Sequence, residues 1–181
     1  EHWEKSKKIN DGLSNFQIIT NIVFMGMGEP LLNYSEVKKA VKILMNDKGL
    51  DFSRRRITLS TAGVVPLIKK AHDELGCMIA ISLHATDDKT RNILVPLNKK
   101  WPIDTIIKTL KDDLKLRNSE RITFEYVMLK DVNDTEFDAK RLVKIIQGLP
   151  SKINLIPFNQ WIGSSYERSS QKKIQGFSEI I

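Results

Sequence analysis

The sequence predicts an α/β fold built around a parallel β-sheet. Two kinds of segment alternate along the 181 residues: short apolar runs rich in branched residues, and longer stretches with apolar residues every three or four positions. Such alternation is typical of strands and helices that follow one another around a parallel sheet. The run at 77–83, CMIAISL, is apolar on both faces, as expected for a strand covered on both sides.

Five apolar runs are expected to form the strands. No low-complexity segment, linker or shift in composition divides the chain, and its length suits one sizeable core. We therefore expect one domain over residues 1–181. The expected strands are 21–27, 56–61, 77–83, 121–129 and 152–157.

The first two helices have start and stop signals. Ser35 can cap the first helix, because its hydroxyl can accept a free backbone N–H, and Glu36 suits the first turn. Gly49 is expected to end that helix. Pro66 stands where a first helical residue would, and Gly76 is expected to stop the second helix. Their apolar stripes are Val37, Ala40, Val41, Leu44 and Met45, and then Leu67, Ile68, Ala71 and Leu75.

Three later stretches also show helical periodicity. A loop with a short helical turn leads to the first of them, at 103–114. Asp134 and Thr135 open the second, and Ser169 and Ser170 precede the third. Their inward residues are Ile103, Ile106, Ile107, Leu110 and Leu114, then Leu142, Ile145, Ile146 and Leu149, and last Ile174, Phe177 and Ile180.

Composition and charge limit the classes of protein to which the chain can belong. Apolar residues make up 41% and charged residues 28%, which is ordinary for a soluble globular protein. No apolar run approaches the ~18 residues that cross a bilayer, and no signal-peptide pattern is present. The net charge of +7 favours a polyanion such as RNA or DNA as partner, with a merely basic protein as an equal alternative.

The single cysteine, Cys77, excludes an internal disulfide framework and suggests a reducing compartment, so we expect a cytoplasmic protein. One thiol alone cannot hold a zinc or iron–sulfur site. The chain begins at Glu1 rather than at Met, and it stops at Ile181 inside a helical pattern. We therefore expect it to be part of a longer protein.

Two parallel architectures compete, an open doubly wound sheet and part of a barrel. The dinucleotide-binding fingerprint is absent, because Gly26-Met27-Gly28 is followed by Glu29 and Pro30 rather than by a third glycine. No GxxxxGK segment is present either. The chemistry at the strand ends favours the barrel, since active sites of parallel α/β barrels form there.

Each expected strand ends in a polar group, and in a barrel these groups would converge on one mouth. A carboxylate can bind an ammonium group, while hydroxyls and an amide can bind carboxylate or ribose oxygens. In strand order the groups are Gly28 and Glu29, Ser60 and Thr61, Ser82 and His84, Lys130 and Asn133, and Asn159.

Four of these residues also have a plain structural interpretation. Glu29 could simply cap the helix that follows it, and Ser60 could be an ordinary hydroxyl at a strand end. His84 could be a structural histidine, and Asn159 could be a turn residue that bonds its own backbone. Each signal is weak alone, and the joint pattern strengthens all four.

Six motifs in order carry a resemblance to a known family. They are GMGEP, LSTAGV, AISLHA, the VPLNKK loop, EYVML with its VND, and INLIPFN. Together they resemble the radical S-adenosylmethionine (SAM) RNA methyltransferases, and more closely the branch that methylates carbon 2 of an adenosine in 23S rRNA and in certain tRNAs. The resemblance runs from about Asn21 to the end of the chain.

The resemblance implies a fold and a cofactor site. The family fold is a partial (β/α)6, TIM-like barrel, and the chain matches strands 2–6 of that radical SAM core domain. The implied cofactors are SAM and a [4Fe–4S] cluster. The residues that match the family's SAM contacts are Gly28, Glu29, Ser60, Ser82, Leu83, His84 and Asn159.

Two family features are missing from this chain. The CxxxCxxC loop that ligates the cluster is absent, as is the catalytic cysteine that carries the methyl group. Cys77 matches neither, and its place at the start of an apolar strand predicts a buried structural thiol. We therefore expect no metal ligand and no catalytic residue in this chain, and no activity from it alone.

The resemblance also implies partners and a mechanism for the whole protein. The RNA substrates would be 23S rRNA and tRNA, and a flavodoxin-type protein would donate the electron. Two SAM molecules would be used per turnover, through a methyl-cysteine outside this chain. We expect a monomer that does not bind membranes.

RNA contacts are expected on the face that carries the strand ends. Lys99 and Lys100, and then Tyr166 and Arg168, follow strands on that face and could offset the cost of unstacking the target adenine. The run 54–56, RRR, precedes a strand and is expected on the opposite face.

Two alternatives remain open. A sibling enzyme methylates carbon 8 of the same adenosine, although Pro30 after Glu29 favours the carbon-2 branch. A non-catalytic RNA- or nucleotide-binding barrel that has lost its cluster is the other. In either case the two edges of a five-strand sheet would be unpaired, so we expect the isolated chain to fold poorly.

Overall fold

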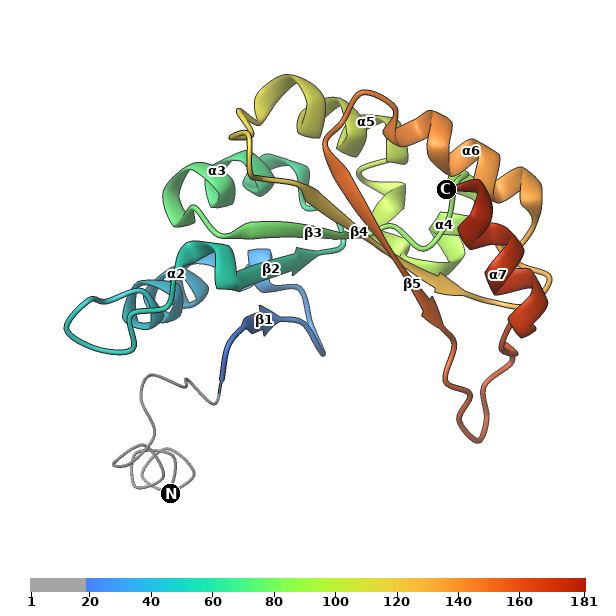
Figure 1. Cartoon of the computed structure of the whole chain (residues 1–181), viewed down its shortest axis with the longest axis horizontal. Helices are drawn as coiled ribbons and strands as arrows, with labels where there is room; N and C mark the ends of the chain where they lie inside the picture. The colour runs from blue at the N-terminus through green and yellow to red at the C-terminus, as the bar shows by residue number, and fades with distance from the viewer. Residues whose placement is uncertain (1–18) are drawn as a thin grey trace.

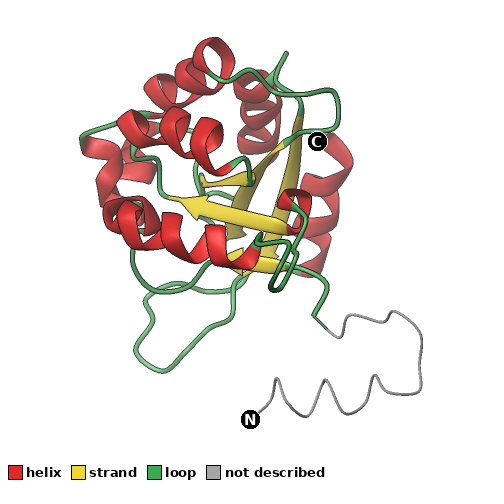
Figure 2. Cartoon of the chain, turned by 90° about the vertical axis from the view of Figure 1, so that its left-hand side faces the viewer, coloured by secondary structure: helices red, strands yellow, loops and turns green. Residues whose placement is uncertain are grey.

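The computed structural model describes residues 19–181 as a five-stranded sheet with helices along one side. All neighbouring strands are parallel, and their spatial order, β1-β2-β3-β4-β5, is their order in the chain. The sheet is curved, and the helices lie outside the curve (Figures 1 and 2). This single winding confirms the predicted α/β fold of partial-barrel type and excludes a doubly wound sheet, whose strand order reverses. The strands are β1 (Ile22–Phe24), β2 (Ile57–Thr61), β3 (Met78–Ser82), β4 (Ile122–Met128) and β5 (Ser151–Pro157).

The first strand is shorter than expected. β1 covers three residues where seven, 21–27, were predicted. Gly26 and Gly28 follow it with φ of 143° and 90°, a region that residues with a Cβ rarely adopt, so the chain leaves the sheet there. The remaining strands agree with the predicted ones to within one or two residues at each end.

Within residues 19–181, six α-helices form the outer layer. Thr135 caps α6 with a capping box to Asp138, Ser170 caps α7, and Gly76 ends α3 in the left-handed conformation, all as predicted. The helices are α2 (Tyr34–Leu44), α3 (Val65–Leu75), α4 (Asp88–Leu94), α5 (Ile103–Lys108) with a π-helical turn to Asp113, α6 (Glu136–Ile146) and α7 (Gln171–Ile180).

The predicted start and end of the first helix are wrong. A 3₁₀ turn, Pro30–Asn33, leads directly into α2, so the backbone is already helical when it reaches Ser35. Glu29 caps that turn in place of Ser35. The helix ends at Leu44 rather than at Gly49.

The hydrophobic core lies between the sheet and the helices. Ile57, Leu59, Ile81 and Phe124 are fully buried in its centre. Cys77 is also buried, 3% exposed, and burial raises the pKa of its thiol to about 11, as suits an inert structural cysteine. Within the described part of the chain, no helix is long and apolar enough to span a bilayer.

Candidate functional site

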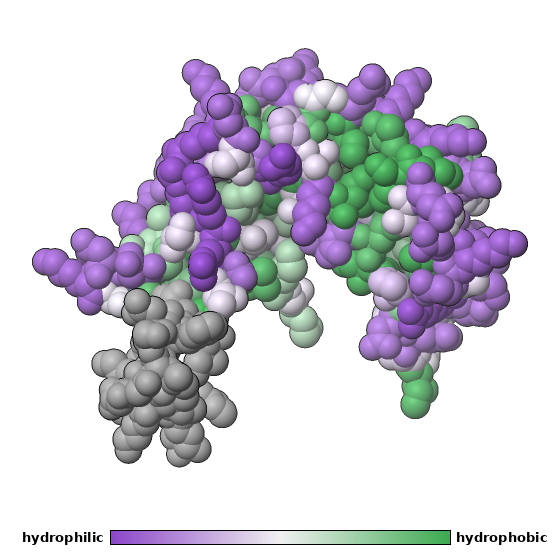
Figure 3. Space-filling view, viewed as in Figure 1, coloured by the Kyte–Doolittle hydropathy of each residue, from purple (hydrophilic) through white to green (hydrophobic). Residues whose placement is uncertain are grey.

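A cavity of about 350 Å³ opens at the carboxyl ends of β1, β2 and β3. Figure 3 shows the molecule hollowed on the side where the sheet is not covered by helices. Of the seven predicted residues, five line this cavity: Gly28, Glu29, Ser60, Ser82 and His84. Its other lining residues are Phe24, Met25, Gly26, Pro30, Thr61, Ala62, Glu125 and Ile156.

Glu29 joins two parts of the cavity wall. Its Oε1 accepts the backbone N–H of Leu31 at 3.0 Å, and its Oε2 accepts the backbone N–H of Ala62 at 2.6 Å, at the end of β2. The carboxylate is therefore a cap and a cavity residue at once. Two fixed N–H donors hold it in place, and lone pairs remain on both oxygens for a ligand.

Ser60 and Ser82 stand side by side on the floor of the cavity. They come from neighbouring strands β2 and β3, and their Oγ atoms are 3.5 Å apart. Ser60 is 9% exposed, so its hydroxyl faces the cavity rather than bulk solvent. The pair offers two adjacent groups that can donate or accept a hydrogen bond.

His84 presents one ring nitrogen toward the cavity. Its Nδ1 accepts the N–H of Val127 at 3.2 Å, which assigns the proton of the neutral ring to Nε2. Burial, with a smaller contribution from the nearby Arg91 charge, lowers the pKa of His84 from 6.5 to about 4. The imidazole is therefore a neutral hydrogen-bond donor at physiological pH.

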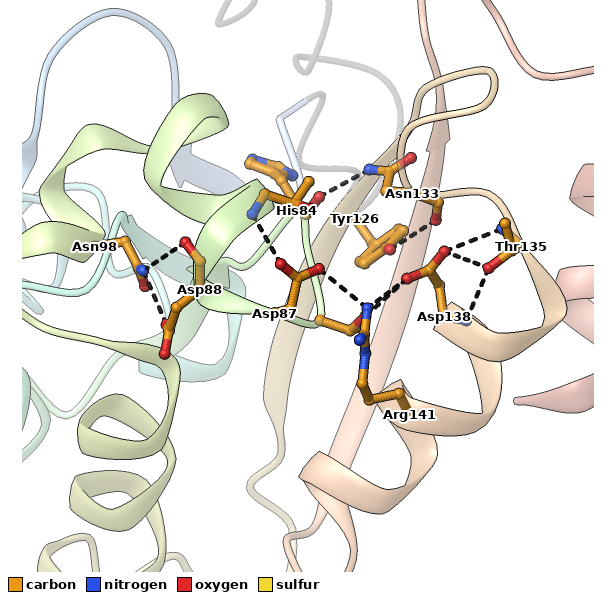
Figure 4. A network of polar contacts seen from close by, with 11 residues as sticks. His84, Asp87, Asp88, Asn98, Tyr126, Asn133, Thr135, Asp138 and Arg141 are labelled. Atoms are coloured by element: carbon orange, nitrogen blue, oxygen red, sulfur yellow. Dashed lines mark hydrogen bonds and ion pairs between the residues drawn. The ribbon is translucent and has the colours of Figure 1, made fainter.

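Asn133 holds the His84 backbone in an unusual conformation. His84 has a φ of 55°, in the left-handed region. The amide of Asn133 donates to the carbonyls of His84 at 2.8 Å and Val127 at 2.7 Å, and accepts the N–H of Leu129 at 2.8 Å. Figure 4 shows Asn133 facing His84, with Tyr126 bonded to the Asn133 backbone. Asn133, which the sequence placed among the polar groups at the strand ends, is thus a buried residue that fixes the backbone around His84.

Arg91 is a residue that sequence reasoning missed. Its fully buried guanidinium donates to the carbonyls of Ala62, Ser82 and Leu83, at 2.8, 2.8 and 2.9 Å, and to the Asn98 side chain at 2.8 Å. These carbonyls lie at the ends of β2 and β3, directly behind the cavity. Burial lowers the pKa of Arg91 to about 10, so it stays charged. An isolated arginine in a polar segment gives no sequence signal of this role.

Glu125 and Asn154 were also missed, although one signal was present. Glu125 is a charged residue inside an otherwise apolar strand, RITFEYVML, where a solvated carboxylate is not expected. It is 7% exposed, lines the cavity, and accepts the Asn154 amide at 2.7 Å through Oε2. A polar residue at the centre of such a strand indicates the interior of the barrel.

Two predicted site residues lie outside the cavity lining. The Leu83 side chain is fully buried, and its N–H donates to the Glu125 carbonyl at 3.0 Å. Asn159 is exposed and follows the end of β5 by two residues. Their role in cofactor binding stays a prediction.

Of the candidate RNA contacts, Lys99, Lys100 and Arg168 are exposed and Tyr166 is partly buried. Lys100 lies 4.5 Å from the Trp101 ring centroid, and Tyr166 packs edge-on against Phe158 at 6.5 Å. The Arg168 backbone forms an isolated bridge with Leu129, at the carboxyl end of β4. The 54–56 run forms a 3₁₀ turn before β2, at the opposite end of that strand, as predicted. RNA contact by these residues stays a prediction.

Comparisons with known proteins agree with this geometry. The sequence pattern of the radical SAM superfamily matches residues 5–141. The chain is 58% identical over 165 residues to the dual-specificity RNA methyltransferase RlmN of Cereibacter sphaeroides, and 54% identical to that of Paracoccus denitrificans. These alignments cover 91% of this chain and 42% of each relative.

Solved structures give the same picture. A radical SAM methyltransferase from Sphaerobacter thermophilus superposes with a TM-score of 0.86 and 37% identity, over 98% of this chain and 50% of that one. A domain of the pyruvate-formate lyase-activating enzyme from Bacteroides vulgatus has a TM-score of 0.65 at 18% identity, covering 88% of this chain and 91% of that domain, which shows a shared fold alone.

Proposed function

The chain belongs to the radical SAM superfamily, and we propose that it forms the SAM-binding wall of an RNA adenine methyltransferase. The proposed reaction is methylation of carbon 2 of adenosine in 23S rRNA and in certain tRNAs. The observation that carries the proposal is the cavity itself, in which Gly28, Glu29, Ser60, Ser82 and His84 meet at the strand ends. Relatives that carry the name dual-specificity RNA methyltransferase support RNA as the substrate.

Each cavity residue has a role that suits one part of SAM. Glu29 receives the ammonium group through its remaining lone pairs, and Gly28 leaves room for close approach of the ligand to the backbone. Ser60 and Ser82 bond polar groups on the floor, and His84 donates from Nε2. A cavity of about 350 Å³ is within the usual range for a small-molecule site.

The iron–sulfur cluster does not fit residues of this chain. Cluster iron is held by thiolates, and the one thiol, Cys77, is buried at the start of β3, away from the cavity. No group of three metal-ligating side chains occurs among residues 19–181. We propose that the cluster ligands and the methyl-carrying cysteine lie elsewhere in the protein. Cluster and SAM together supply radical chemistry that SAM alone does not, and this chain supplies binding and orientation.

RNA is the proposed macromolecular partner. The net charge of +7 favours binding to a polyanion. Lys99, Lys100, Tyr166 and Arg168 are the proposed contacts, and the target adenine would leave its stack to reach the cavity. A flavodoxin-type electron donor, a monomeric state and a cytoplasmic location complete the proposal.

The decisive experiment uses the whole protein that carries this chain. RNA treated with SAM and a reductant is digested, and the methyladenosine isomer is identified by mass spectrometry against standards. We expect 2-methyladenosine, and its loss in a Glu29→Gln variant but not in a Glu136→Gln control, whose carboxylate is 78% exposed on α6. 8-Methyladenosine would favour the sibling activity. Absence of any product, together with absence of a CxxxCxxC segment from the gene, would favour a non-catalytic barrel.

A further inference from the structure

The loop between β5 and α7, residues 158–170, carries two large apolar side chains into solvent. Trp161 is 62% exposed, and Ile162 is fully exposed. In Figure 1 the loop projects beyond the carboxyl end of β5, and Figure 3 shows green, apolar atoms at its tip. The loop leaves the sheet just after Ile156, which lines the cavity. The apolar tip therefore stands at the rim of the candidate site.

The tip has a defined shape. The N–H of Ser164 donates to the carbonyl of Trp161 at 3.1 Å and closes a β-turn with Ile162 at its corner. Gly163 has a φ of 93°, which glycine favours at the third position of such turns. The Trp161 ring packs edge-to-face against Phe158, with ring centroids 5.2 Å apart, and Phe158 is itself buried. A buried ring thus supports the exposed one.

The base of the loop is tied to the end of β4. The N–H of Lys130 donates to the carbonyl of Glu167 at 2.9 Å, and the Arg168 backbone forms a bridge with Leu129. An apolar tip that is fixed both at its base and at its turn cannot fold back to cover itself.

Other exposed apolar side chains gather on the same face of the molecule. Met25 and Met27 follow β1, and Val132 follows β4, as Trp161 and Ile162 follow β5. Exposed apolar side chains that are scattered singly need no explanation, whereas a group around a cavity mouth indicates an interaction surface.

The charges near the tip favour a polyanion over an apolar protein surface. Glu167 is the one acidic residue of the 158–170 loop, and its carboxylate pairs with Lys130. Arg168 and Lys172 are exposed, and neither forms an ion pair with a residue of the described chain. The surface therefore offers free cations and an aromatic ring. Binding sites for single-stranded RNA combine these two, since cations contact phosphates and rings stack on bases.

The position of the ring suggests what it stacks on. An adenine that enters the cavity must leave its stack, and the base beside it then loses a stacking partner. An aromatic ring at the rim can take the place of that partner. Stacking on a ring tolerates any base, because every base has a π-face.

We propose that Trp161 stacks on the base next to the extruded adenosine, with Ile162 packed beside it, and that Arg168 contacts a flanking phosphate. This surface rests on the proposed function for the identity of the RNA. It makes the 158–170 loop the part of this chain that holds the RNA open at the cavity mouth.

The test measures RNA affinity in the whole protein that carries this chain. The probe is a labelled RNA hairpin that contains the adenosine methylated in the experiment described above. We expect Trp161→Leu to weaken binding ~5- to 150-fold, the contribution of stacking on one base. Trp161→Phe keeps an aromatic face and should lose only about 2- to 5-fold. Ile43→Ser is the matched control, because Ile43 is 65% exposed on α2, and it should bind like the unsubstituted protein.

Two further measurements separate stacking from charge. Trp161→Leu should leave the salt dependence of binding unchanged, since stacking releases no counterions, whereas Arg168→Gln should reduce the slope of log affinity against log salt by about 1. A hairpin with an abasic residue on one side of the adenosine should bind the unsubstituted protein as weakly as the intact hairpin binds Trp161→Leu. Trp161→Leu should add little to that loss, because the two changes remove the same contact.

The outcomes separate this inference from the proposed function. If Trp161→Leu binds the hairpin as tightly as the unsubstituted protein, or if Trp161→Phe loses as much as Trp161→Leu, the stacking surface is wrong and the proposed function stands. A lower urea midpoint or failure to fold in Trp161→Leu would show that another part of the protein covers the ring. A change from dimer to monomer would show that a second copy does. Either result overturns the inference. If the unsubstituted protein neither methylates nor binds RNA, both fall.

Discussion

The centre of the sheet and its edges hold the candidate site in different ways. At the centre, Arg91 and Asn133 bind the backbone at the ends of β2, β3 and β4 through buried hydrogen bonds. At the edges, β1 has three residues, Val23 is 54% exposed, and Ile156 on β5 is 37% exposed. The central strand ends are held by buried side chains of the chain itself, whereas the edge strands carry exposed side chains. Substitutions at the centre should therefore damage folding, and those at the edges should act mainly on ligand binding.

The largest effect is expected at Arg91. Arg91→Met removes the donors to three buried carbonyls and to Asn98, and each unsatisfied polar group costs about 1–3 kcal/mol. We expect the free energy of unfolding to fall by at least ~4 kcal/mol, which is most of the stability of a typical domain. Urea unfolding followed by circular dichroism measures this. Arg117→Met is the matched control, because the Arg117 side chain is 53% exposed. If Arg91→Met lowered the free energy of unfolding by less than ~1 kcal/mol, Arg91 would not be what holds the central strand ends in place.

A smaller loss is expected at Asn133. Asn133→Ala breaks three buried hydrogen bonds, which predicts a loss of about 2–4 kcal/mol in the free energy of unfolding. Asn133→Asp should be no better, since it turns the amide donor toward the carbonyls of His84 and Val127 into a second acceptor. Chemical denaturation of both variants checks the order. An aspartate variant as stable as the parent would show that these carbonyls find other donors.

The pH dependence of stability tests the environment of His84. Burial, and to a smaller extent Arg91, lower its pKa in the folded protein from 6.5 to about 4. As pH falls through about 6.5, the unfolded chain therefore gains a proton that the folded chain does not, and the folded state loses stability until the pH reaches about 4. Between pH 7.5 and pH 5 this amounts to about 2 kcal/mol. His84→Asn, which tolerates a positive φ, should show a pH profile flatter by that amount in urea titrations. Identical profiles would contradict the assigned burial.

The sequence predicted correctly those features that depend on residues close together in the chain. The strand order, the cap at Thr135, the stop at Gly76 and the convergence of Glu29, Ser60, Ser82 and His84 follow from periodicity, cap chemistry and the family motifs. It failed where the cause is a distant contact. The 3₁₀ turn that displaced the Ser35 cap is itself capped by Glu29, whose carboxylate also accepts the N–H of Ala62, just after β2. Arg91 is defined by carbonyls 8 to 29 positions away in the chain, which no local pattern reveals.

Glu29 stands between the two regions and should show both kinds of effect. Glu29→Gln keeps the size of the side chain, but its amide nitrogen cannot accept one of the two backbone N–H groups of Leu31 and Ala62. We expect a stability loss of about 1 kcal/mol and a much larger loss of affinity for S-adenosylhomocysteine, ~10- to 100-fold. Calorimetric titration and urea unfolding of the same preparation separate the two. If the affinity for S-adenosylhomocysteine were unchanged, Glu29 would serve only to cap the 3₁₀ turn.

The smallest effect on folding is expected at Asn159, beyond the edge strand β5. Its side chain is exposed, and no side-chain hydrogen bond joins it to other residues of the described chain, so Asn159→Ala should change the free energy of unfolding by less than ~0.5 kcal/mol. If the family assignment of this residue holds, the affinity for S-adenosylhomocysteine should nevertheless fall by a few-fold, because one neutral hydrogen bond contributes about 0.5–1.5 kcal/mol. Asn118→Ala, an exposed asparagine in the turn before β4, at the opposite end of the strands, is the matched control. Unchanged affinity would show that Asn159 does not contact the ligand. If the free energy of unfolding also fell, the expectation that edge substitutions act on binding rather than on folding would be wrong.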